Sequence, residues 1–131
     1  MWSEMSGRSK RKELIILHPV GVAYKTDENK VMRIEIYAEY VEALEGIEKL
    51  SYIDVLYWMH KLTEKDRRKL KVHPRGDLSK PLTGVFATRS PMRPNPIGLT
   101  RVRLLRRERN VLFVEGLDAL DGSPIIDIKS G

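Results

Sequence analysis

Short apolar stretches separated by glycine, proline and charged turns make up most of the chain. Apolar and polar residues alternate over residues 31–39, which predicts a half-buried strand. A continuous apolar run over residues 52–59 predicts a well-buried strand. Residues 14–24 are also rich in aliphatic side chains, and the proline and glycine inside this stretch predict a strand with a bend.

The second half of the chain repeats the strand-like pattern. Strands are predicted at residues 84–88, 97–105, 111–115 and 125–128, with extended chain at 72–75. The dipeptide Arg109-Asn110 lies between two of these strands and predicts a hairpin turn.

Two short helices are predicted between the strands. Residues 40–51 place four aliphatic side chains at three-residue spacing, which gives one apolar face and an acidic opposite face. Thr63 and Asp66 have the spacing of a helix cap, so a short helical turn is expected there.

These elements predict a mostly β fold. About seven short strands with one or two short helices, and no alternation of strands with helices, favour a β-barrel or a barrel-like sheet. A chain of 131 residues is long enough for one domain with its own core. We assign that domain to residues 13–131 and interpret residues 1–12, which are rich in lysine and arginine, as a basic flexible arm.

One stretch, residues 84–100, has an unusual composition. Three prolines and two glycines surround Arg89, Arg93 and Asn95. Proline fixes φ and removes a backbone donor, so this stretch must form a stiff loop between strands. Such a loop is either a structural crossover or a rigid support for a binding site.

The charge of the chain is positive and unevenly distributed. The formal net charge is +6, and residues 61–80 carry eight lysines and arginines against three acidic residues. Residues 101–110 carry five basic residues against one acidic residue. Such clusters favour a phosphate-rich partner such as nucleic acid, although basic surfaces also occur without that role.

Several classes of site lack their sequence signatures. The chain has no cysteine, which excludes disulfides and zinc–thiolate sites and is compatible with a cytosolic protein. It has no signal peptide, no apolar run long enough to span a membrane, and no glycine-rich nucleotide fingerprint. The three histidines lack metal-binding spacing, so no metal is expected.

Three side chains are candidates for chemistry from their positions alone. His60 follows a buried strand and either belongs to a site or packs against the core. Asp118 and Asp121 are close enough to converge on one ligand, or they simply cap turns.

The proline-containing stretch also resembles a known family. Residues 84–99, together with 116–124 and 127–129, closely resemble the TrmO (YaeB/TsaA-like) family of S-adenosylmethionine-dependent tRNA methyltransferases. The resemblance implies a single-sheeted, non-Rossmann β-barrel and a cytoplasmic homodimer with the cofactor near the subunit interface. It further implies methylation of N6 of threonylcarbamoyl-adenosine at tRNA position 37, with threonine tRNA as the expected substrate.

The resemblance also assigns roles to individual residues. The cofactor contacts that it implies are His60, Lys61, Arg89, Leu99, Asp118, Ala119, Leu120 and Asp121. Lys61 departs from the glutamine expected in bacterial relatives. Asp121 or His60 is the candidate base, and Asn95 is expected to orient the N6 group. The expected tRNA contacts are Arg93, Arg67, Arg68, Arg101 and Arg103. The alternative function is a noncatalytic β-barrel module that binds RNA or S-adenosylmethionine.

Overall fold

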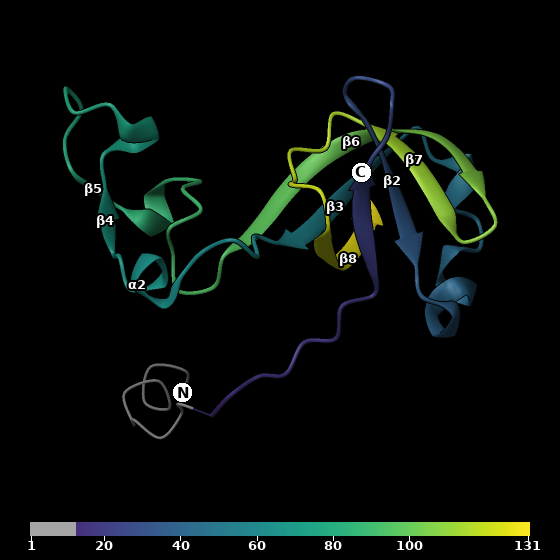
Figure 1. Ribbon diagram of the computed structural model, residues 1–131, viewed down its shortest axis with the longest axis horizontal. Coiled ribbons are helices and arrows are strands. Elements are labelled where there is room, and N and C mark those ends of the chain that lie inside the picture. Colours follow the sequence, from purple (N-terminus) through teal and green to yellow (C-terminus); the bar gives the residue numbers. More distant parts are fainter. Residues whose placement is uncertain (1–12) are drawn as a thin grey trace, which may run out of the picture.

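The structure is a computed structural model, and it describes residues 13–131. Six strands form a closed antiparallel barrel in the order β1-β2-β7-β6-β3-β8 (Figure 1). They are β1 (Gly21–Lys25), β2 (Val31–Ile36), β3 (Tyr52–Trp58), β6 (Ile97–Glu108), β7 (Val111–Glu115) and β8 (Ser123–Ser130). The predicted mostly β, barrel-type fold is therefore confirmed.

Alternation along the strands produces the core of the barrel. In β3 the side chains of Ile53, Val55 and Tyr57 are buried. Leu56 and Trp58, which point to the other face of the strand, are only partly covered. This strand is therefore buried on one face, although its sequence is almost continuously apolar. The core contains Ala23, Met32, Ile34, Ile36, Leu44, Ile47, Ile53, Val55, Tyr57, Val102, Leu104, Leu112, Val114, Leu117 and Ile125.

Residues 59–96 leave the barrel between β3 and β6 and form a lobe that projects from it (Figure 1). Its elements are α2 (Glu64–Arg67), β4 (Lys71–Val72), the 3-10 helix η4 (Pro74–Gly76), β5 (Thr83–Gly84) and the 3-10 helix η5 (Val85–Ala87). The predicted cap is present, because Thr63 Oγ1 accepts from Asp66 N at 3.2 Å while Asp66 Oδ2 accepts from Thr63 N at 3.0 Å. The pairing of β4 with β5 was not predicted.

The predicted helix at 40–51 is two 3-10 helices, η2 (Ala38–Leu44) and η3 (Ile47–Lys49). Gly46 separates them with φ of 88°, a backbone conformation that glycine adopts without strain. Leu44 and Ile47 are buried, so the predicted apolar face does pack against the core.

Other boundaries differ from the sequence predictions. The first strand begins only at Gly21, and residues 13–20 before it form no helix or strand. Only the first residue of the predicted strand 84–88 pairs, after which the chain turns into η5. The extended segment at 72–75 likewise ends at Val72. The predicted arm at 1–12 lies outside the described residues.

Candidate functional site

A cavity of about 1000 Å³, here called the junction cavity, lies where the lobe meets the barrel. Its apolar lining residues are Leu56, Met59, Leu62, Phe86, Ala87, Pro91, Ile97, Gly98, Leu99, Ala119 and Leu120. Its polar lining residues are Tyr57, Lys61, Thr88, Arg89, Arg93, Thr100, Asp118 and Ser123. The cavity therefore joins three segments far apart in sequence: the end of β3, residues 86–100, and the loop between β7 and β8.

The proline loop, residues 88–96, is held together by one of its own arginines. Arg93 Nε donates to Ser90 O at 2.7 Å, and Arg93 Nη2 donates to Val85 O and Thr88 O, both at 2.7 Å. Because a guanidinium has a fixed fork of donors, these bonds fix the path of the loop around it. Arg93 lines the cavity as a structural clamp of the proline loop.

A second arginine fastens the proline loop to the lobe. Arg67 Nε donates to Pro94 O at 2.9 Å, and its guanidinium lies 5.3 Å from the centre of the Trp58 ring. The Met59 N–H donates to Pro96 O at 2.8 Å. The loop is thus held from α2, from the residue after β3 and from within itself, which makes it a rigid wall of the cavity.

Tyr57 connects β6 to the loop between β7 and β8 at the cavity. Its hydroxyl donates to Asp118 O at 2.5 Å and lies 3.1 Å from Thr100 Oγ1. A Cβ at Gly98 would collide with the ring atoms of Tyr57, so only glycine allows this packing. Burial raises the pKa of the Tyr57 phenol, which therefore stays neutral and able to donate.

The loop between β7 and β8 is anchored to β1. Asp121 Oδ1 accepts from Lys25 N at 2.8 Å, and Gly122 N donates to Ala23 O at 2.8 Å. Ser123 Oγ donates to Leu120 O at 2.6 Å. These bonds hold the exposed Leu120 at the mouth of the cavity.

The structure brings together most of the predicted cofactor residues. Those that line the junction cavity are Lys61, Arg89, Leu99, Asp118, Ala119 and Leu120. His60 and Asp121 are not among the lining residues, although both chain neighbours of His60, and Leu120 before Asp121, are. The buried Nδ1 atom of His60 has no hydrogen-bond partner among the described residues.

Asn95 lies on the other side of the proline loop from the cofactor residues. It lines a separate groove of about 710 Å³ together with Trp58, Arg67 and Ile97. Ile97 lines both the groove and the junction cavity, so the two spaces are neighbours across this residue.

Sequence reasoning missed several lining residues, including Tyr57, Thr100 and Phe86. Tyr57 occupies a core position of an alternating strand, and nothing local in the sequence separates it from an ordinary core aromatic. Phe86 is 83% exposed, an unusual state for phenylalanine that only the fold reveals.

The two basic clusters differ in their pairing. Four arginines of β6 form ion pairs with acidic residues: Arg101 with Asp54, Arg103 with Glu115, Arg106 with Glu108, and Arg107 with Glu48. The Arg101 guanidinium lowers the pKa of the Asp54 carboxyl through a hydrogen bond. Among residues 13–131, no lysine or arginine of the lobe has an ion-pair partner.

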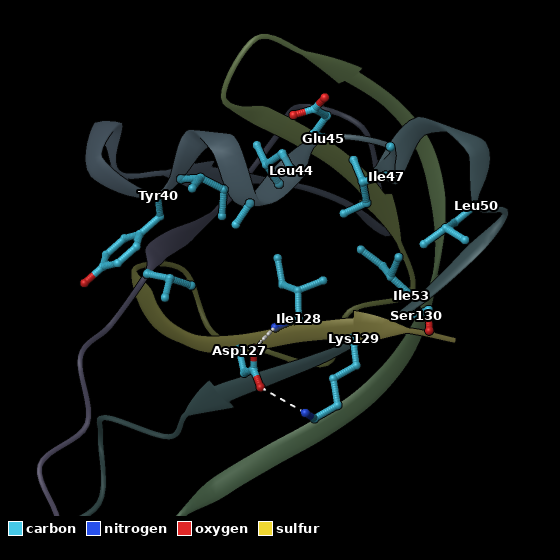
Figure 2. A pocket seen from close by; sticks show the side chains of 14 residues that line it. Tyr40, Leu44, Glu45, Ile47, Leu50, Ile53, Asp127, Ile128, Lys129 and Ser130 are labelled. Atoms are coloured by element: carbon cyan, nitrogen blue, oxygen red, sulfur yellow. Dashed lines mark hydrogen bonds and ion pairs between the residues drawn. The ribbon is translucent and has the colours of Figure 1, made fainter.

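A smaller cavity of about 330 Å³ lies between β8 and the helices η2 and η3 (Figure 2). Leu44, Ile47 and Ile128 project into it. At its rim Asp127 Oδ2 is paired with Lys129 Nζ at 3.2 Å. This cavity offers a largely apolar space, lined in addition by Glu45.

Comparison with known proteins identifies the family. Residues 21–130 match the model of the tRNA-methyltransferase O N-terminal domain, TrmO_N. The chain belongs to the TrmO family. The matched range runs from the first barrel strand to the last, so it includes all three segments of the junction cavity.

Close relatives of this TrmO-family chain occur in archaea. A protein of Methanocaldococcus jannaschii is 49% identical over 114 residues, which are 86% of this chain and 89% of that protein. The S-adenosyl-L-methionine-binding protein of Archaeoglobus fulgidus is 49% identical over 127 residues, with 88% of each chain covered.

A solved structure shares the TrmO fold. The crystal structure of TrmO from Pseudomonas aeruginosa superposes with a TM-score of 0.69 at 29% identity. The superposition covers 91% of this chain and 56% of that chain. The chain thus spans little more than half the length of this bacterial TrmO.

Residues 13–131 hold neither a metal-ligand cluster nor a membrane-spanning helix. No group of three or more metal-ligating side chains comes together in this part of the chain. No helix there combines the length and apolar character needed to cross a membrane.

Proposed function

We propose that this chain binds S-adenosyl-L-methionine in the junction cavity and methylates N6 of threonylcarbamoyl-adenosine at position 37 of tRNA. The observation that carries the proposal is the convergence of Lys61, Arg89, Leu99 and residues 118–120 on one cavity. These residues come from three separate segments, and the family resemblance assigned all of them to the cofactor. The names of the Archaeoglobus and Pseudomonas proteins support the same ligand and reaction class.

The chemistry of the cavity suits this cofactor. The exposed apolar side chains of Phe86, Leu99 and Leu120 supply faces on which an adenine can lie. Arg89 and Lys61 supply positive charge for a carboxylate, and Asp118 supplies acceptors for hydroxyl or ammonium groups. The unpartnered Nδ1 of His60 is a further indication, because buried polar atoms normally have a partner.

The contribution of the protein to the reaction is alignment. When bound, S-adenosyl-L-methionine supplies a methyl group on a sulfonium, which is open to in-line displacement. Displacement tolerates little misplacement of the reacting atoms. Alignment of donor and acceptor lowers the activation free energy by several kcal/mol, and by about 7–11 kcal/mol in the best cases. Arg93 and Arg67 clamp the proline loop, and Tyr57 holds the loop between β7 and β8; these contacts provide the rigidity that alignment requires.

His60 is the favoured base among the three catalytic candidates. Asp121 is exposed and already accepts from the Lys25 N–H. Asn95 borders the neighbouring groove and remains a candidate for orienting the carbamoylated base from that side. His60 adjoins two cavity-lining residues and has an imidazole nitrogen without a partner in the described chain.

The tRNA surface that we propose is the lobe. Its lysines and arginines have no ion-pair partners within residues 13–131, whereas Arg101 and Arg103 are neutralised by Asp54 and Glu115. Free cations release more counterions from nucleic acid than paired ones. Arg68 therefore remains a phosphate contact in this proposal. Arg93 and Arg67 act on the loop conformation, and Arg101 and Arg103 contribute less.

The proposed active form is a homodimer that acts in the cytoplasm. The exposed Phe86, Leu99 and Leu120 beside the open cavity support a homodimer, because a second subunit would cover apolar surface there. Threonine tRNA is the proposed substrate, and the cytoplasm, where tRNA is modified, is the proposed compartment. The alternative is a barrel that binds the cofactor or RNA without methylating it.

One experiment separates the enzyme from the noncatalytic module. Threonine tRNA carrying threonylcarbamoyl-adenosine is incubated with the protein and labelled S-adenosyl-L-methionine, and its nucleosides are analysed by mass spectrometry. We expect one labelled methyl group on the modified adenosine. Cofactor binding by calorimetry without any methyl gain would support the noncatalytic module.

A further inference from the structure

The segment before β1 has a surface that does not suit an isolated subunit. Leu14, Ile15, Ile16 and Leu17 are consecutive, and their exposed fractions are 94%, 85%, 78% and 47%. Scattered exposed aliphatic residues are ordinary, but a run of four on an extended chain is a contiguous apolar surface. We call residues 14–17 the aliphatic arm.

The aliphatic arm starts from a fixed point on the barrel. Val20 N donates to Ile125 O at 2.7 Å, and Val20 O accepts from Tyr37 N at 3.0 Å. Before Val20 the chain runs away from the barrel (Figure 1). Residues 14–17 have no backbone hydrogen bond to residues 13–131. The arm thus presents backbone groups without partners in the described chain, together with largely exposed aliphatic side chains.

The same chain carries a groove of matching character. The groove of about 710 Å³ next to the arm is lined on the barrel side by Trp58, Ile97, Pro124 and Ile126. Residues of the arm border it as well, yet the exposure of Leu14 and Ile15 shows that they leave the groove open. The groove therefore lies between the arm and the barrel, and it has room for another extended segment.

We infer that the aliphatic arms of two copies of this chain dock reciprocally, each arm lying between the arm and the barrel of the other copy. We call this reciprocal docking the exchange. Every copy has one arm and one groove. Two copies related by a two-fold axis would therefore form two equivalent arm–groove contacts within one self-complementary interface. The arm carries no charge, which makes it unsuitable for a nucleic-acid phosphate. A run of four aliphatic residues is also far shorter than the roughly 20 needed to cross a bilayer.

The exchange would also reach the candidate site. Arg67 and Asn95 border the groove, and Arg67 holds Pro94 of the proline loop. The partner's arm would therefore pack against the back of the wall that forms the junction cavity, so that dimer formation stabilises the proline loop.

Disulfide trapping tests the exchange directly, because the chain has no cysteine of its own. A tagged Ile15→Cys chain is mixed with an untagged Ile126→Cys chain under mild oxidation. We expect a cross-linked pair of the two different chains. The control mixture replaces Ile126→Cys with Leu78→Cys, an exposed position in the lobe, and should give only the background level of cross-linking. Equal cross-linking in the two mixtures would overturn the exchange.

Sedimentation measurements provide an independent test. The variant Ile15→Asp/Ile16→Asp changes only exposed side chains, so it should fold normally and dissociate at least tenfold more readily than the unaltered chain. The matched control, Leu70→Asp/Leu78→Asp, adds the same charge at exposed leucines of the lobe and should leave the dimer intact. A monomeric unaltered chain, or equal dissociation of both variants, also contradicts the inference. Neither test involves cofactor or tRNA, so failure here is distinct from failure of the proposed methylation.

Discussion

The hydroxyl of Tyr57 donates a hydrogen bond to the backbone carbonyl of Asp118, 61 positions later in the chain. The same hydroxyl lies 3.1 Å from Thr100 Oγ1 on β6. One phenol thus links β3 to β6 and to the loop between β7 and β8 at the junction cavity. The position of the 118–121 loop relative to these two strands depends on this hydrogen bond.

Removing that hydroxyl should weaken cofactor binding. In Tyr57→Phe the ring still packs on Gly98, but Asp118 O no longer has its donor, and a hydrogen bond of this kind is worth about 0.5–1.5 kcal/mol. We expect the dissociation constant for S-adenosyl-L-methionine in calorimetry to rise by up to about tenfold. The control is Tyr24→Phe, a tyrosine of β1 outside the cavity lining. Equal affinities of the two variants would contradict the prediction.

Tyr57 should also make stability depend on alkaline pH. Burial raises the pKa of its phenol above the ordinary value of 10.0. Below that value the phenol is neutral in both states and its contribution is fully present. As the pH rises further, the unfolded chain ionises first and the contribution is lost. Urea unfolding between about pH 9 and 11 should show a steeper loss for the unaltered chain than for Tyr57→Phe.

Substitution of Arg93 should lower the stability of the protein, whereas substitution of Arg89 should lower its affinity for the cofactor. Arg93→Met removes three hydrogen bonds and leaves Ser90 O and Thr88 O without a donor, while Val85 O keeps Thr88 as its donor. We expect a loss of about 1–3 kcal/mol in the free energy of unfolding. Arg89→Met alters an exposed side chain, so stability should stay within about 0.5 kcal/mol while cofactor affinity falls. Urea denaturation and calorimetry on both variants measure these effects. Stable folding of Arg93→Met would argue against the clamp.

The lobe should dominate the salt dependence of tRNA binding. Lys65→Ala/Arg68→Ala should reduce the slope of log K against log salt by about 1 for each phosphate that the variant can no longer neutralise. Arg101→Ala/Arg103→Ala changes the net charge by the same amount but removes arginines that are already paired, so its effect should be smaller. Filter binding over a range of salt concentrations compares the two. A larger change in slope for Arg101→Ala/Arg103→Ala than for Lys65→Ala/Arg68→Ala would indicate that tRNA binds at β6 and not at the lobe.

His60 and Asp121 should respond differently to amide substitution. Asp121→Asn keeps an oxygen that can accept from Lys25 N, so methylation should continue at a rate within a few-fold of the unaltered chain. His60→Asn removes the proposed base and should lower kcat by about 10²–10⁴-fold, with a much smaller change in cofactor affinity. Single-turnover methylation and calorimetry measure the two quantities. Loss of turnover only in Asp121→Asn would reassign the base.

Features that depend on neighbouring residues were predicted from the sequence alone. The hairpin at Arg109-Asn110, the alternating strand predicted at 31–39 and the Thr63 cap each follow from residues a few positions apart. The strand itself ends at Ile36. The stiffness of the proline loop is likewise a property of its own prolines. The family resemblance rests on the same local stretch, and six of the eight residues that it assigns to the cofactor line the junction cavity.

The tertiary structure decided which partner each long side chain meets. The sequence could not show that Arg93 turns back onto its own loop, that Arg101 pairs with Asp54 on β3, or that Asn95 borders a second groove. Nor did it indicate that residues 14–17, which have the composition of a buried strand, lie exposed. Local sequence determines backbone conformation, whereas side-chain partners distant in sequence are set only when the barrel closes and brings β3, β6 and β8 together.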